Sequence, residues 1–362
     1  MVPSSTMRAA SFALGLLLIL LFAGPLASSE TAVLPPPSAG AQALPPADPT
    51  QPGPYAVGVT RRTFTRASST SGQPRALETV IWYPANVSSL LPDPTLEGTV
   101  DAPPEQTGGP YPVLLWSHGS GGVPWEATYF TAHLASHGFV VVAPTHVGNS
   151  TDCPFPCLPT NPRARSSIIE AEMDRPDDVI VSFDGALALS AGGDVLLAGL
   201  LDPERAGVAG LSFGAGTAVR VIGRDRRFRA AVAFAPYASS STRQAVTTID
   251  GPTMLWGGHL DEVLPFPQQQ ELYRGLSSSG PERWLLAFPR AGHFAFGNYC
   301  PPVLATCGPN TMPQARAHLL IRRWSTPFLR RHVALDARYA ELANPALAEA
   351  DPDLRISFMP GS

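Results

Sequence analysis

Ser212 stands in a sequence pattern that is typical of an activated serine nucleophile. Gly210 and Gly214 flank it in a Gly-x-Ser-x-Gly motif, which follows the apolar run 206–209 and precedes a helix-compatible stretch, 214–222. Between a strand and a helix, this motif holds the serine on a strained turn, and glycine on both sides lets the two elements approach closely. The other interpretation is a Gly-rich turn with a structural serine; the strand–turn–helix setting favours the nucleophile.

A serine hydroxyl needs a base to take its proton and a carboxylate to orient that base, in the chain order Ser, acid, His. We predict His293 as the base, because it follows the apolar run 284–288 in a loop at the carboxyl edge of the expected sheet. Ligands of open α/β sheets bind at that edge. We predict Asp261 as the acid, since it follows the run 253–256 at the same edge; Glu262 is its near rival.

Acyl transfer also needs hydrogen-bond donors where the carbonyl oxygen becomes negative, and two backbone amides usually supply them. One is expected from Phe213, directly after the serine. The other is expected from Ser120, which lies among glycines in the loop after the apolar run 113–116. His118 is expected to support this loop without being catalytic. The alternative is an ordinary Gly-rich turn.

Two residues are predicted to contact the substrate, namely Trp125 and His146. His146 begins a segment, 145–165, that follows a strand at the active edge and is therefore expected to wall the pocket. Simple packing explains either residue equally well.

The four cysteines form two close pairs along the chain, Cys153 with Cys157 and Cys300 with Cys307. Two disulfides in an oxidising compartment are the first expectation, and loop-closure entropy favours pairing within each pair. A four-cysteine zinc site is the alternative, but the spacings differ from the usual two-residue knuckle. No metal ligand set is therefore predicted.

The pattern of apolar runs predicts a mostly parallel, doubly wound α/β sheet in one domain. Strands buried on both faces are expected at 113–116, 139–143, 206–209, 230–234, 253–256 and 284–288. Helices are expected at 125–136, 165–189, 214–222, 267–276 and 313–332. Near the amino terminus, 57–65 and 76–83 alternate apolar and polar residues, as in an antiparallel hairpin.

Composition excludes several classes of function. All 25 basic residues are Arg, so Schiff-base chemistry, pyridoxal phosphate chemistry, the phosphate-binding loop lysine and Ser-Lys hydrolases are excluded. The net charge of -4 gives no reason to expect a nucleic-acid partner. The 44% of apolar residues suffices for a substantial core.

The amino-terminal residues 1–29 have the features of a signal peptide, with cleavage near Ser29. Their uninterrupted apolar run is shorter than the ~20 residues that span a bilayer, so no stable membrane span is expected. Residues 30–54 read as a Pro-rich linker, 55–345 as the catalytic domain and 346–362 as a carboxyl-terminal tail. The protein is therefore expected to be secreted or periplasmic.

Several further motifs carry a resemblance to a known family. They are the segments beginning Gly53-Pro-Tyr-Ala, Val80-Ile-Trp-Tyr, Trp116-Ser-His-Gly, Leu134-Ala-Ser-His, Arg175-Pro-Asp-Asp, Leu201-Asp-Pro-Glu and Gly292-His-Phe-Ala. With them, residues from about 53 to 342 resemble the platelet-activating factor acetylhydrolase-like group, in the dienelactone hydrolase and polyester hydrolase branch of the α/β hydrolases.

This resemblance implies the α/β-hydrolase fold and a serine esterase that uses Ser212, Asp261 and His293 without metal or cofactor. The implied substrates are short acyl esters of lipids, or small or polymeric esters, and no obligate protein partner is implied. Leu211 is a departure, because acetylhydrolase-like enzymes often have His there. The phrase at 134–141 also resembles cutinase-like enzymes, so a polyester hydrolase is the second hypothesis. A non-catalytic binding module on the same scaffold is the rival from another class.

Overall fold

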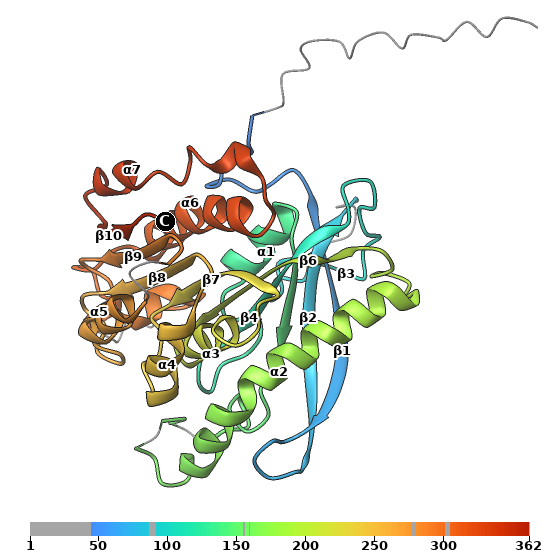
Figure 1. Ribbon diagram of the computed structural model, residues 1–362, viewed down its shortest axis with the longest axis horizontal. Helices are drawn as coiled ribbons and strands as arrows, with labels where there is room; N and C mark the ends of the chain where they lie inside the picture. The colour runs from blue at the N-terminus through green and yellow to red at the C-terminus, as the bar shows by residue number, and fades with distance from the viewer. Residues whose placement is uncertain are drawn as a thin grey trace, which may run out of the picture. The chain divides into compact units, whose positions relative to one another are not determined.

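The computed structural model describes residues 45–86, 92–154, 156–158, 160–276, 280–300 and 305–361. The predicted signal peptide and residues 30–44 of the predicted linker lie outside them. A ten-stranded sheet in the order β10-β9-β8-β7-β6-β4-β5-β2-β1-β3 organises the described chain (Figure 1). Its strands are β1 (Ala56–Ala67), β2 (Pro74–Ala85), β3 (Thr99–Val100), β4 (Tyr111–Ser117), β5 (Val140–Pro144), β6 (Leu201–Leu211), β7 (Phe228–Phe234), β8 (Thr253–Gly258), β9 (Arg283–Phe288) and β10 (Arg355–Met359).

The six central strands, β4 to β9, run parallel to one another. Apart from the polar, partly exposed start of β6, they are short apolar runs without alternation and nearly all of their residues are buried, as strands covered on both faces require. The amino-terminal pair β1 and β2 forms an antiparallel hairpin, and β2 joins β5 antiparallel. The predicted α/β-hydrolase fold, with its mostly parallel sheet and antiparallel hairpin, is confirmed.

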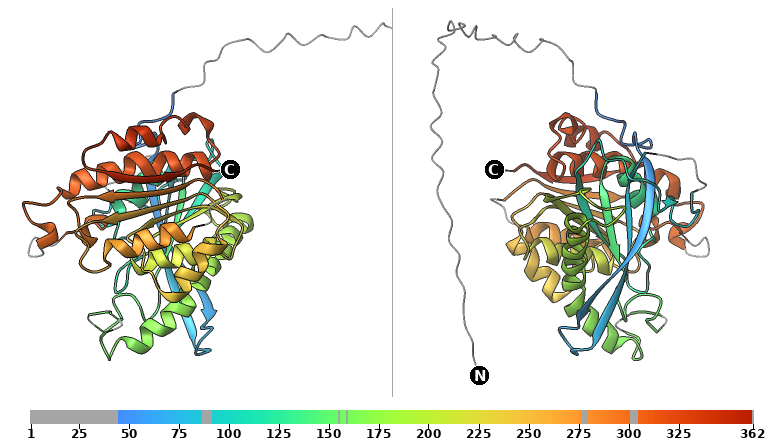
Figure 2. Two further views of the ribbon diagram at one scale, coloured as in Figure 1. Left: turned by 60° about the vertical axis from the view of Figure 1, so that its left-hand side comes forward. Right: turned by 90° about the vertical axis from the view of Figure 1, so that its right-hand side faces the viewer.

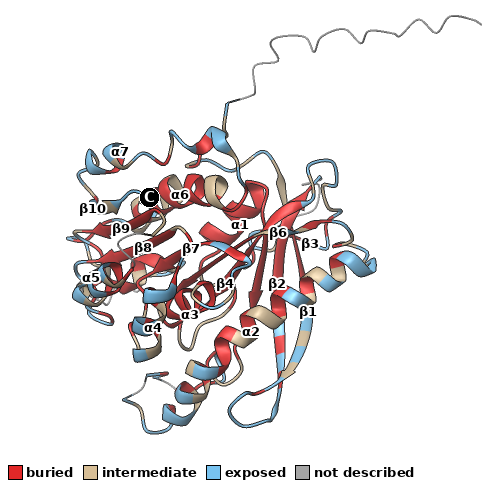
Figure 3. Ribbon diagram, in the orientation of Figure 1, coloured by how far each residue is buried: buried red, intermediate tan, exposed pale blue. Residues whose placement is uncertain are grey.

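Helices cover both faces of the sheet. They are α1 (Thr128–Ser136), α2 (Arg165–Gly192), α3 (Phe213–Ile222), α4 (Ser240–Ala245), α5 (Phe266–Gly275), α6 (Gln314–His332) and α7 (Pro345–Glu349). One core cluster packs α1 and α6 against the sheet, and a second packs α2, α3 and α5 against its other face. Figure 2 shows α6 in red on one side of the strands and α3 to α5 in yellow and orange on the other. The strands between them are buried (Figure 3).

The two ends of the described chain differ from the predicted domain boundaries. Residues 346–362 were expected to be a tail, but β10 pairs antiparallel with β9 and so extends the sheet. Phe358 packs edge-on against Trp284, with ring centroids 4.8 Å apart. At the other end, the Gly53 amide donates to Ser136 Oγ at 2.8 Å. Part of the predicted linker therefore belongs to the folded unit, which covers 45–361 of the described residues.

Helix α1 begins at Thr128, three residues later than predicted, because the preceding residues form turns after the Gly-rich loop. In the part of the chain that the structure describes, no helix has the length and apolar character needed to cross a membrane.

Candidate active site

Ser212 lies on a tight turn between the end of β6 and the start of α3. Its φ of 58° is a left-handed value that non-glycine residues rarely adopt, so the backbone is strained at this residue. A Cβ added to Gly210 would lie 2.4 Å from the Gly214 carbonyl oxygen, and one added to Gly214 would lie 1.9 Å from the carbonyl oxygen of Ser117. Only glycine fits at both positions, and the motif therefore presents the Ser212 side chain at the end of a buried strand.

His293 and Asp261 are joined by a hydrogen bond at the same edge of the sheet. The 2.8 Å contact links His293 Nδ1 to Asp261 Oδ2. The other carboxylate oxygen accepts the amides of Val263 and Leu264 at 2.9 and 2.7 Å, which fixes the Asp261 rotamer. This arrangement leaves Nε2 of the imidazole free to exchange a proton in the cavity that it lines.

Glu262, the rival acid, points elsewhere. Its carboxylate contacts the Thr306 hydroxyl at 3.5 Å. Asp261 is therefore the carboxylate that the structure places on His293.

A cavity of 610 Å³ brings the predicted residues together. Ser212 and His293 both line it, and so do Ser120 and Trp125, three of them at loops that follow parallel strands. The remaining lining residues are Gly119, Gly121, Val123, Glu126, Pro156, Cys157, Leu158, Leu211, Val263, Phe294, Gly297, Asn298 and Tyr299. This lining is mostly apolar with a few polar groups, as in a site for a small organic ligand.

The Gly-rich loop, residues 118–122, follows β4 and passes close to Ser212. A Cβ added to Gly119 would lie 3.6 Å from Ser212 Cβ. The Gly119 amide donates to Glu126 Oε1 at 2.6 Å and the Gly121 amide to the Asn149 carbonyl at 3.1 Å. Among the described residues the Ser120 amide, which lies between them, has no acceptor.

The Phe213 amide has no acceptor within the described chain either, for a different reason. Phe213 is the first residue of α3, and the first amides of a helix have no intrahelical partner. The two amides predicted as donors thus have no partner in the described part of the chain and lie beside Ser212, where they could bind an anionic oxygen.

His146 does not line the cavity, and its predicted substrate contact is wrong. The side chain is fully buried between Ser117 Oγ at 2.9 Å and Asp178 Oδ2 at 3.0 Å. Burial lowers the pKa of His146 well below its ordinary value, so the ring is neutral. The prediction failed because Asp178 comes from helix α2, which the position of His146 after a strand does not reveal.

His118 does support the Gly-rich loop, since its Nδ1 contacts the Gly119 carbonyl at 2.7 Å. Burial, and after it the charge of Arg175, lower its pKa well below the ordinary value.

Two charged residues near the site were given no role from the sequence, although Arg175 opens one of the motifs that carry the family resemblance. Glu126 lies beneath the Gly-rich loop, and burial raises the pKa of its carboxyl group to about 8. Arg175 in α2 is fully buried and donates to Asn149 Oδ1 at 2.7 Å, to Ser117 Oγ at 3.0 Å and to the His118 carbonyl.

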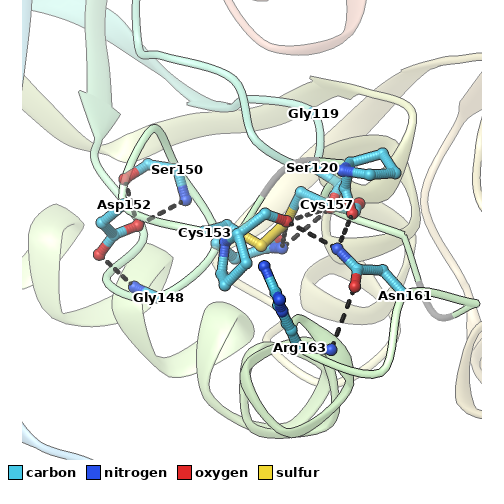
Figure 4. The surroundings of a disulfide bond; sticks show 12 residues. Gly119, Ser120, Gly148, Ser150, Asp152, Cys153, Cys157, Asn161 and Arg163 are labelled. Carbon is cyan, nitrogen blue, oxygen red and sulfur yellow. Dashed lines mark hydrogen bonds between the residues drawn. A yellow bond between two sulfur atoms is a disulfide. The ribbon is translucent and has the colours of Figure 1, made fainter.

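Disulfides join Cys153 to Cys157 and Cys300 to Cys307, the local pairing that was expected. The four-cysteine zinc site is therefore excluded. Among the described residues no group of three or more His, Cys, Asp or Glu side chains is placed to hold a metal ion. Figure 4 shows the first disulfide beside Ser120 and Gly119 of the Gly-rich loop.

Comparison with known proteins gives one family and two distant relatives. The family model described as PETase, PET hydrolase-like, matches residues 97–356. Platelet-activating factor acetylhydrolase of Cavia porcellus is 27% identical over 173 residues, which are 39% of this chain and 40% of that protein. Cutinase est1 of Thermobifida alba is 24% identical over 249 residues, 68% of this chain and 69% of the cutinase. The chain thus spans less than half of the acetylhydrolase and about two thirds of the cutinase.

Proposed function

The chain belongs to the PET hydrolase-like family, and from that membership we propose that it is an exported serine hydrolase of carboxylic esters. One observation carries the proposal. Ser212, on a strained turn, lines the same cavity as His293, and His293 Nδ1 is hydrogen-bonded to Asp261. The relatives are described as an acetylhydrolase and a cutinase, which supports ester bonds as the target.

In the proposed mechanism the reaction has two halves. His293 Nε2 takes the hydroxyl proton as Ser212 Oγ attacks the ester carbonyl, and the same imidazolium then protonates the leaving alcohol. Water, deprotonated by His293, next attacks the acyl-enzyme; the acid leaves as the imidazolium returns the proton to Ser212 Oγ. Asp261 keeps the imidazole in the required tautomer and stabilises its charge. No cofactor takes part in these steps.

The amides of Ser120 and Phe213 would bind the oxyanion of both tetrahedral intermediates. Loss of one such donor costs ~3 to 4 kcal/mol of transition-state stabilisation in other serine hydrolases. That neither amide has a protein acceptor among the described residues supports this role.

Small or short-acyl esters, including those of lipids, are the first proposed substrate class, because the cavity can enclose only a small ligand. A polyester is the second, and the family supports it. Three exposed apolar side chains on the cavity also favour contact with a polymer, since Leu158, Val263 and Tyr299 are 41%, 38% and 68% exposed. Trp125 is proposed to contact either substrate.

We also propose that residues 1–29 direct export and are removed near Ser29. The two disulfides support this, because disulfides persist in oxidising compartments. The proposed catalytic domain then consists of the folded unit, 45–361.

Hydrolysis of p-nitrophenyl esters from acetyl to palmitoyl by the mature protein and by Ser212→Ala tests the proposal. We expect activity that is highest for short chains and absent in the variant. A polyester film assayed for soluble products tests the second substrate class. If neither protein cleaves any ester, the proposal fails and a non-catalytic binding module takes its place.

A further inference from the structure

Asn149 lies beneath the Gly-rich loop and contacts it at two consecutive residues. Its side-chain Nδ2 donates to Ser120 Oγ at 2.9 Å, and its backbone carbonyl oxygen accepts the Gly121 amide at 3.1 Å. Asn149 is fully buried. We propose that Asn149 is the positioning residue that aims the Ser120 amide into the cavity without itself touching substrate; this rests on the proposed function.

The side-chain amide of Asn149 has one allowed orientation. Arg175 Nη1 donates to Asn149 Oδ1 at 2.7 Å. Because a guanidinium group has donors only, the oxygen must face Arg175 and the nitrogen must face the loop. The second hydrogen of Nδ2 points to Cys157 Sγ at 3.1 Å. Every polar atom of the side chain is thereby used, and such buried networks are rigid.

The Ser120 hydroxyl bridges Asn149 and the first disulfide. It accepts from Asn149 Nδ2 and donates its single hydrogen to the Cys157 carbonyl at 2.8 Å. Figure 4 shows Ser120 beside Cys157. The next residue of the loop, Gly121, has a φ of +71°, and a Cβ added to it would lie 3.1 Å from Cys157 Cβ. Ser120 is therefore held by its own side chain and by the next residue, while its amide stays unpaired.

Arg175 connects this arrangement to the second proposed donor. The same guanidinium that orients Asn149 lies over the Phe213 ring, 5.0 Å from its centroid. The atoms that accept its hydrogen bonds among the described residues are all neutral: Asn149 Oδ1, Ser117 Oγ and the His118 carbonyl oxygen. Burying a guanidinium charge that no carboxylate binds directly costs free energy. We therefore attribute the position of Arg175 to holding the Ser120 and Phe213 amides in place, and not to stabilising the fold.

The central test is Asn149→Asp, which keeps the size, the Arg175 contact and the backbone bond to Gly121 but removes the Nδ2 hydrogens donated to Ser120 Oγ and Cys157 Sγ. We expect kcat for p-nitrophenyl acetate to fall at least about tenfold while KM changes less than about twofold, since a misplaced oxyanion donor weakens transition-state binding. Rates are normalised to the Ser212 sites that a fluorophosphonate probe can label, and melting temperatures are measured alongside. Asn161→Ala is the matched control, because Asn161 holds Pro154 and Pro156 beside the same disulfide but makes no bond to the Gly-rich loop.

A double-mutant cycle separates positioning from structural support. If Asn149 acts through the Ser120 hydroxyl, Ser120→Ala, which keeps the amide, also lowers kcat, and adding Asn149→Asp lowers it little further. Ser120→Ala carries the test on its own if Asn149→Asp does not fold.

An unchanged kcat in folded Asn149→Asp, or in Ser120→Ala, overturns the inference while wild-type activity upholds the proposed function. A fall in kcat that the Asn161→Ala control reproduces also overturns it. If the wild type cleaves no ester, the proposed function and this inference fail together.

Discussion

Asp261 and Glu262 are adjacent carboxylates with different surroundings, and this difference supplies a test at the residue scale. We predict that Asp261→Asn lowers kcat by a factor of about 10³ to 10⁴, because an amide at this position favours the wrong tautomer of His293. The matched control is Glu262→Gln, because the Glu262 carboxylate faces Thr306 and not His293. The kcat of this variant should stay within about twofold of the wild-type value. Steady-state kinetics on one short ester decide the matter. Equal losses in the two variants would contradict the assignment of the acid.

The partly buried carboxyl group of Glu126 is expected to make the free energy of unfolding depend on pH. Burial raises its folded-state pKa from 4.5 to about 8, so the folded protein keeps a proton that the unfolded chain releases. The stability that this proton contributes is complete below about pH 4.5 and is lost as the pH rises towards 8. In the variant Glu126→Gln, the side-chain oxygen can still accept the hydrogen bond from the Gly119 amide, but the side chain carries no charge.

We therefore predict that the melting temperature of Glu126→Gln, relative to the wild type, increases steadily from pH 5 to pH 8 and then levels off. Calorimetry at five or six pH values measures this difference. The same substitution at exposed Glu78 is the control and should give no such trend. A difference that does not change with pH at Glu126 would show that its carboxyl group is ionised throughout.

At the scale of elements, β10 closes one edge of the sheet beside β9, which leads directly to the loop of His293. The strand pairs through five residues, and Phe358 covers Trp284. We predict that ending the chain after Leu354 lowers the melting temperature by at least about 5 °C, because it uncovers an edge strand and a buried ring. A chain that ends after Met359 is the control. If both truncated proteins melt like the wild type, residues 355–359 form a dispensable tail.

The elements that the sequence predicts well are those with local signals. The central strands are uninterrupted apolar runs, and the Gly-x-Ser-x-Gly turn marks β6, Ser212 and α3 together. Strand β10 was missed because it is a short edge strand, in which exposed residues alternate with partly buried ones. Its apolar residues contact β9, some 70 positions earlier, and nothing in its own sequence reveals that partner.

At the scale of the whole molecule, the candidate site also contains residues with a local sequence signal and residues without one. Ser212, Asp261 and His293 could be predicted because each follows a recognisable strand at one edge of the sheet. Asn149 and Arg175 could not, because their contacts join the loop after β5 to helix α2 and the Gly-rich loop. His146 was wrongly assigned to the cavity for the same reason. Its partner Asp178 lies in the distant helix α2 and holds it in the core.

The central claim is that Ser212 is the nucleophile of an ester hydrolase. It is tested most directly by treating the mature wild-type protein with a fluorophosphonate probe and locating the adduct by peptide mass spectrometry. We predict one adduct per chain, on Ser212, formed in step with the loss of esterase activity and slowed by a short ester. An adduct on another residue, or full esterase activity in a protein labelled at Ser212, would contradict the account.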